Sequence, residues 1–190
     1  MERRGWHTRG YLPHFDADRF QFITIRLADS LPQTILKKFE QERAHGKLEH
    51  FYDREFQIKI EAYLDKGIGA CYLARTEIAE IVVHSLRMFD GERYDLRAWV
   101  VMPNHAHVLL KALSGFSLSS IMKGIKGNTA NQANTLLGRK GQFWHPDYFD
   151  RFVRDQDHFD KAVRYIENNP VKAGLVLRPE EWRFSSAYVD

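Results

Sequence analysis

The chain is poor in cysteine and in long apolar runs. Cys71 is its single cysteine among 190 residues, which excludes an internal disulfide framework and a zinc site built on several thiolates. No apolar run approaches the roughly eighteen residues of a membrane-spanning helix, so we expect no membrane partner. Residues 1–6 lead into no apolar core, so we expect no secretory signal and a cytoplasmic protein.

Acidic residues are missing from one long stretch. The whole chain carries 28 Lys and Arg against 25 Asp and Glu, a formal net charge of +3, but residues 111–146 contain no Asp or Glu. The basic residues of this stretch are interleaved with polar and aromatic side chains, which suit a nucleic-acid backbone and unstacked bases. Because a run of charge is most often a solvated face, the pattern supports DNA binding only in combination with other features.

Apolar periodicity predicts the order of secondary structure. Residues 1–18 are polar and indicate a loosely ordered arm, and the single domain is expected at 19–190. Strands are predicted at 19–28, 94–101, 105–111 and within 143–153, and helices at 30–44, 53–65, 76–89, 117–137 and 155–168. The last helix is expected to stop at Asn169–Pro170. The turn-like Met102–Asn104 favours a hairpin, and with it an α+β antiparallel sheet with helices on one face. A ferredoxin-like arrangement is compatible with this order.

His105 and His107 are the sharpest chemical feature. On a strand, residues two apart project from the same face, so the two imidazoles lie side by side at a spacing that can share one metal ion. Two half-buried histidines with backbone partners are the alternative. A third ligand that supplies a carboxylate or amide oxygen would favour Mg²⁺ or Mn²⁺.

Tyr165 and Asn169 are four residues apart and share one face of a helix. A tyrosine can act as a covalent nucleophile, but its ordinary pKa of about 10 means that it needs help at neutral pH. A nearby metal would help, and Asn169 could lend its amide oxygen to the same ion. A core tyrosine followed by a C-capping asparagine is the alternative.

Several blocks of the chain together resemble a known family. Met102–Leu110 resembles the histidine–hydrophobic–histidine (HUH) signature of single-tyrosine transposases, and Phe143–Asp155 resembles the next block of that family. Arg164–Val176 resembles its tyrosine helix, and Trp182–Ala187 also fits. The chain is most similar to REP-associated tyrosine transposases, which are relatives of bacterial insertion-sequence transposases.

The resemblance implies a ferredoxin-like α+β domain that nicks and rejoins hairpin-forming single-stranded DNA. By position, it implies Tyr165 as the nucleophile that forms a 5′-phosphotyrosine link. His105, His107 and Asn169 would be ligands of Mg²⁺ or Mn²⁺. The helical segment 53–90 is an insertion relative to minimal insertion-sequence enzymes. We expect the DNA to contact basic and aromatic residues: Lys111, Lys123, Lys126, Arg139, Lys140, Trp144, Arg151, Arg154 and Lys172.

Other readings stay open at this point. The chain could be a domesticated, non-catalytic DNA-binding or regulatory protein that keeps the transposase fold. A plasmid-type replication initiator is disfavoured because no helicase-like Walker segment is present, and an unrelated metal hydrolase would need further ligands. The resemblance leaves open whether the protein works as a monomer or as a homodimer that exchanges tyrosine helices.

Overall fold

The structure is a computed structural model that describes residues 6–8, 13–15, 18–32, 34–37, 41 and 54–189. Its strands are β1 (Trp6–Thr8), β2 (Pro13–Phe15), β3 (Gln21–Arg26), β4 (Tyr94–Val101), β5 (His105–Ala112) and β6 (Phe149–Phe152). Its helices are α2 (Arg54–Leu64), α3 (Thr76–Arg87), α4 (Leu118–Leu136) and α5 (Gln156–Lys172), with short 3₁₀ turns at Tyr72–Ala74 and Pro179–Glu181. Within these residues, no helix combines the length and apolarity that a membrane span requires.

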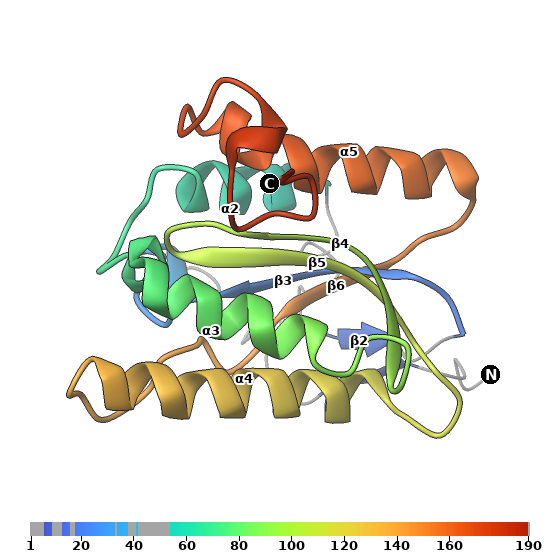
Figure 1. The fold of residues 1–190 in the computed structure, drawn as a ribbon, viewed down its shortest axis with the longest axis horizontal. Coiled ribbons are helices and arrows are strands. Elements are labelled where there is room, and N and C mark those ends of the chain that lie inside the picture. Colours follow the sequence, from blue (N-terminus) through green and yellow to red (C-terminus); the bar gives the residue numbers. More distant parts are fainter. Residues whose placement is uncertain are drawn as a thin grey trace.

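Four strands form one antiparallel sheet in the order β4-β5-β3-β6 (Figure 1). In chain order, β3 is followed by helices, then by the β4–β5 hairpin, then by α4 and β6, so the two central strands are the first and third of the four. This is the ferredoxin-like order of strands and helices. The predicted α+β antiparallel sheet and the hairpin at Met102–Asn104 are therefore confirmed, and the hairpin closes with a hydrogen bond from the Met102 N–H to the His105 carbonyl.

Helices cover both faces of the sheet, so the expectation of helices on one face is wrong. On one face, α3 and α4 pack on Ile23, Ile25 and Val108. On the other face, α5 packs on Val100 and Leu109, and α2 lies on this same side (Figure 1). The reason is that the first six residues of β5 are all buried, so both faces of this central strand need cover.

A β-bulge in β4 changes which of its residues face each side of the sheet. The pairing with β5 shifts between Leu96 and Ala98, which leaves Arg97 as an extra residue. Before the bulge, Tyr94 and Leu96 face α3 and α4, whereas after it Ala98 faces α5. One inserted residue thus exchanges the two faces of the strand.

Helix α5 does not stop at Asn169–Pro170, as the sequence predicts, but continues to Lys172 with Pro170 inside it. Proline removes only its own N–H bond, and here it lies in the last turn, where the Ala173 and Leu175 N–H groups still bond to the Asn169 and Pro170 carbonyls. Asn169 is therefore an interior helical residue rather than a cap. Its side chain stays one turn from that of Tyr165.

The N-terminal part of the chain is described only in pieces. Within the predicted arm, β1 and β2 pair as an antiparallel two-stranded sheet, and the other residues of 1–17 lie outside the described residues. The predicted helix 30–44 is helical at 34–37 and 41, while 33, 38–40 and 42–44 lie outside them. The remaining predicted helices and strands are confirmed with small shifts of their ends. The division into arm, domain and insertion stays a prediction.

Ile166 of α5 is fully buried in the cluster that joins this helix to the sheet. We expect Ile166→Val to lower the free energy of unfolding by about 1 kcal/mol, because it removes one buried methylene and leaves a small cavity. Urea unfolding followed by circular dichroism measures the change. Leu177→Val, at a side chain that is 87% exposed, should stay within about 0.5 kcal/mol of the wild type. Equal losses in the two variants would show that α5 does not dock as described.

Candidate active site

His105 and His107 project from β5 toward α5 and are both fully buried. Their Nε2 atoms face each other at 3.2 Å, and the two rings lie at 75° to each other. Two ligands bound about 2.1 Å from one ion, roughly at right angles, are themselves about 3 Å apart. The separation of the two nitrogens therefore fits a shared ion.

The other ring nitrogen of each histidine is held by a polar side chain. The Nδ1 of His105 lies 2.8 Å from the Asn104 Oδ1, and the Asn104 Nδ2 donates to the Ile68 carbonyl, which fixes the orientation of the amide. His105 therefore carries its proton on Nδ1 and leaves its Nε2 lone pair free to bind. The Nδ1 of His107 lies 2.9 Å from the Thr24 Oγ1.

Thr24 allows His107 two proton positions. Without an ion, the His107 Nε2–H donates to the His105 Nε2, and the Thr24 hydroxyl donates to the His107 Nδ1. If both Nε2 atoms bound an ion, the His107 proton would move to Nδ1 and the same hydroxyl would accept it. A hydroxyl serves both states because it is donor and acceptor.

Both histidines are held neutral. Burial lowers the pKa of His105 to about 3, with a further contribution from the charge of Lys172. Burial also holds the pKa of His107 well below its ordinary value, and His105 and Lys172 add to this effect. Neutral imidazole is the form that binds metal ions.

Tyr165 of α5 lies against the histidine pair, and Asn169 follows one turn later on the same helix. The rings of Tyr165 and His107 pack edge to face with centroids 5.5 Å apart. The amide of Asn169 is buried, and neither its oxygen nor its nitrogen has a formed hydrogen bond. A buried amide without partners costs free energy unless something satisfies it, and an ion beside the histidines would do so. The donor set of two imidazoles and an amide oxygen fits a divalent cation.

The phenol of Tyr165 is buried beside α2. Its oxygen has no formed hydrogen bond. Burial raises the pKa of this phenol far above its ordinary value, and the nearby carboxylates of Glu61 and Asp65 raise it further, while Asn169 opposes the rise. Tyr165 is thus neutral and needs a proton acceptor or a nearby positive charge before it can attack an electrophile.

A cavity of about 360 Å³ opens beside the phenol. It lies between α2, β6 and α5, and its walls combine apolar residues with charged ones; Ile60, Glu61, Phe149, Arg151 and Lys161 contribute to it, together with Tyr165. The tyrosine therefore faces a space that combines apolar surface with charged side chains of both signs, since Asp150 also lines it.

The residues predicted to bind DNA fall into two sets. Five of them are engaged within the protein. Lys111 pairs with Asp18 at 2.9 Å, and Lys172 pairs with Asp65 at 2.8 Å. Lys126 donates to the carbonyls of 145 and 146, Arg139 lies over the ring of Tyr72, and Trp144 is buried with its indole N–H donating to Thr129.

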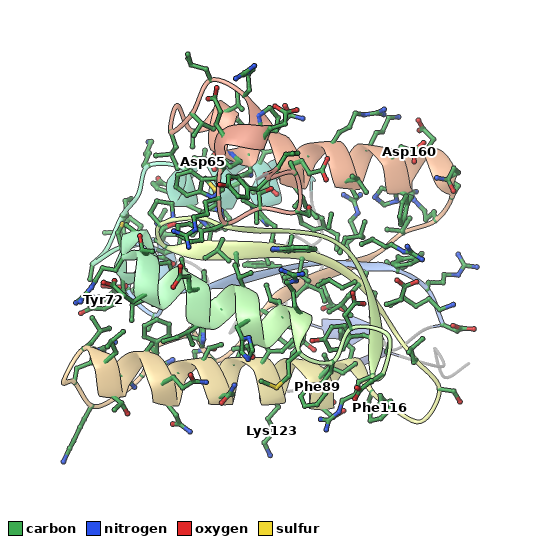
Figure 2. The ribbon with its side chains drawn as sticks, in the orientation of Figure 1. Asp65, Tyr72, Phe89, Phe116, Lys123 and Asp160 are labelled. Carbon is green, nitrogen blue, oxygen red and sulfur yellow. The ribbon has the colours of Figure 1, made fainter. Side chains whose placement is uncertain are left out.

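The other four are exposed on the surface: Lys123, Lys140, Arg151 and Arg154. Lys123 projects from α4 away from the sheet (Figure 2), and it borders a groove of about 800 Å³ between α4 and residues 141–148. Since α4 lies across the sheet from the histidines, this groove and the tyrosine cavity are on opposite faces. Arg151 lines the tyrosine cavity itself.

Sequence reasoning missed Thr24 and Glu61. Thr24 lies opposite His107 in the register of β3 and β5, and a register of this kind leaves no local signal in the sequence. Glu61 comes from α2 and borders the cavity. Asn104 stands beside His105 in the quoted motif, but its side chain was interpreted only as part of a turn.

Comparisons with known proteins identify relatives of this chain. Residues 74–169 match the model of a protein family described as IS200-like transposases. A REP-associated tyrosine transposase of Escherichia coli K12 is 32% identical over 113 residues, which span 58% of this chain and 66% of that relative. The chain thus covers just under two thirds of that relative's length. The solved structure of a REP-associated tyrosine transposase bound to a REP hairpin has a similar fold, with a TM-score of 0.55 and 21% identity over 95% of this chain and 81% of the other.

The buried histidines make stability depend on pH. Folded His105 has a pKa of about 3, whereas the unfolded side chain has one of about 6.5. Between these values the unfolded chain binds more protons, so stability is complete above about pH 6.5 and is lost as the pH falls. His107 acts in the same direction. With a chelator present, we expect the free energy of unfolding to fall from pH 7 to pH 5, approaching about 1.4 kcal/mol per pH unit for each histidine.

Urea unfolding at the two pH values measures this loss. The double variant His105→Gln/His107→Gln should show a shallower dependence than the wild type, while His84→Gln, at an exposed position on α3, should keep the wild-type slope. An unchanged slope in the double variant would contradict the buried neutral pair.

Proposed function

The chain belongs to the IS200-like transposase family, and from this premise we propose that it nicks and rejoins single-stranded DNA through Tyr165. The observation that carries the proposal is that Tyr165 packs edge to face on His107 while the two histidine Nε2 atoms converge at 3.2 Å. A nucleophile and a pair of metal ligands thus meet in one buried site.

The proposed reaction is a transesterification. The Tyr165 oxygen attacks the scissile phosphorus, the bond from phosphorus to the 3′ oxygen breaks, and a 5′-phosphotyrosine and a free 3′-hydroxyl result. The ester bond is conserved in this exchange, so a 3′-hydroxyl can later attack the phosphotyrosine and rejoin the strands. Edge-to-face packing on Phe22 and His107 holds the phenol ring in place for both steps.

We propose His105, His107 and Asn169 as the residues that hold a divalent ion, Mg²⁺ or Mn²⁺. Such an ion would supply polarisation of a phosphate oxygen and neutralise charge that develops there. The chain contributes orientation: Asn104 and Thr24 fix the two imidazoles, and burial keeps them neutral.

The DNA partner is proposed as hairpin-forming single-stranded DNA. The solved structure of similar fold has a REP hairpin bound, and this chain offers two surfaces for a phosphate backbone. Arg151 and Lys161 border the tyrosine cavity, and Lys123 borders the groove along α4. Two surfaces on opposite faces of the sheet suit a substrate with a paired stem and an unpaired strand that reaches the site.

Tyr165→Phe tests the nucleophile. The variant lacks the attacking oxygen but keeps the ring and its packing, so we expect the covalent protein–DNA product to fall by at least about 10³-fold while hairpin binding is retained. A denaturing gel with labelled single-stranded hairpin DNA detects the product, and a native gel measures binding. Tyr188→Phe, at an exposed position near the C-terminus, should react as the wild type does. A phosphotyrosine adduct in Tyr165→Phe would overturn the assignment.

Thr24→Val tests the metal site through the hydroxyl that holds His107. The variant keeps the shape of the side chain but removes the hydroxyl that orients His107, so we expect Mn²⁺ affinity to fall by about 10–100-fold. His105→Ala and His107→Ala should abolish binding. Isothermal titration with Mn²⁺ measures each affinity, and Thr135→Val, exposed on α4, is the matched control. Wild-type affinity in both alanine variants would place the metal elsewhere.

A further inference from the structure

Glu61 is the part of α2 that meets the nucleophile. Its neighbours Ile60 and Leu64 are buried against Leu31 and anchor the helix, while the half-buried Glu61 lines the same cavity as Tyr165. The carboxylate and the phenol are close enough for hydrogen bonding between them to act on the pKa of both groups. Asn169 is the other side chain whose hydrogen bonding acts on the phenol, and it lowers the phenol pKa.

The other basic groups around this cavity are already engaged. The Nε2 atoms of His105 and His107 point at each other, and the Nδ1 of His158 accepts from the Arg154 N–H. Asp65 pairs with Lys172, and Asp150, which also lines the cavity, has an interaction partner too. Glu61, by contrast, forms no ion pair with any residue that the structure describes, so its carboxylate is available to the phenol.

We infer that Glu61 is the general base that accepts the phenolic proton when Tyr165 attacks the scissile phosphate. This inference rests on the proposed function of Tyr165. It assigns α2 a chemical role beyond covering the sheet, and it names the substrate-facing group that allows a neutral phenol to react.

The step balances without a further reactant. As the Tyr165 oxygen bonds to phosphorus, its proton passes to the Glu61 carboxylate. The bond from phosphorus to the 3′ oxygen breaks with its electron pair on that oxygen, which takes a proton from water. In the joining step an incoming 3′-hydroxyl loses its proton to water and attacks phosphorus, and the protonated Glu61 returns its proton to the departing phenol oxygen.

The charges around Glu61 suit this task. Burial raises the pKa of its carboxyl group, and Asp65 adds to the rise, while the phenol, Lys172 and Arg151 oppose it. Asp150, His158 and Lys161 also line the cavity. A carboxylate whose pKa is shifted upward is a better proton acceptor than one at its ordinary value.

Glu61→Gln tests the inference because it keeps the size of the side chain and removes its basicity. Under single-turnover conditions at pH 7.5, we expect phosphotyrosine formation on hairpin DNA to slow by about 10²–10⁴-fold, with DNA affinity unchanged. The wild-type rate should fall at acid pH as Glu61 is protonated, and this acid limb should be absent from the residual rate of Glu61→Gln. A merely structural role for Glu61 would not remove the limb.

Two further variants separate the possible outcomes. Glu92→Gln, exposed between α3 and β4, should react as the wild type does, and Asp65→Asn should slow the reaction much less than Glu61→Gln. A Glu61→Gln rate within about threefold of wild type or above it, or an equal loss in Asp65→Asn, would overturn the general base and leave the nucleophile intact. Failure of the wild type itself to form the adduct would instead overturn the proposed function, and this inference with it.

Discussion

The register between β3 and β5 is the constraint on which the rest of the site depends. It places Thr24 directly opposite His107, so that a hydroxyl meets one imidazole while Asn104, in the preceding turn, meets the other. Side chains alternate along a strand, and a slip by one residue would move both histidines to the face that α3 and α4 cover. The apolar residues between and beside the histidines prevent that slip, because Ala106 and Val108 are buried on the opposite face.

Packing of α5 on the sheet brings this helix to the histidines. The helix docks through Ile166 and Ala162 onto the sheet, and the residues one position before and three after Ile166 are Tyr165 and Asn169. Since Pro170 lies in the last turn and removes only one N–H bond, the helix stays regular through Asn169. The tyrosine and the asparagine therefore project from one regular helix face, and packing of the core determines the position of the proposed nucleophile.

The fold could largely be predicted from local patterns, whereas the environment of the site could not. Alternation of apolar residues at 94–101 and the Met102–Asn104 turn predicted the β4–β5 hairpin, and the spacing of His105 and His107 predicted their common face. The predicted end of α5 was wrong because a proline in the last turn of a helix removes only one backbone hydrogen bond, and the helix can continue past it. Local patterns did not predict which residues of α2 line the tyrosine cavity or which partners the basic residues have. Both depend on contacts between distant segments, such as Lys172 with Asp65.

Contacts within the protein also involve many of the basic residues that were predicted to bind DNA. Five of the nine residues predicted to bind DNA are engaged within the protein, and Lys126 is so enclosed that burial lowers its pKa to about 8. Much of the positive charge that was predicted to attract a phosphate backbone therefore makes contacts within the protein, a distinction that composition alone does not make.

The most direct test of a single site shared by metal ligands and nucleophile is the anomalous scattering of Mn²⁺ in crystals of the protein. The account predicts one peak within bonding distance of the Nε2 atoms of His105 and His107 and of the Asn169 amide oxygen, with Tyr165 of the same chain facing it. No peak between the two histidines, or a peak that faces the tyrosine of another chain, would contradict the account.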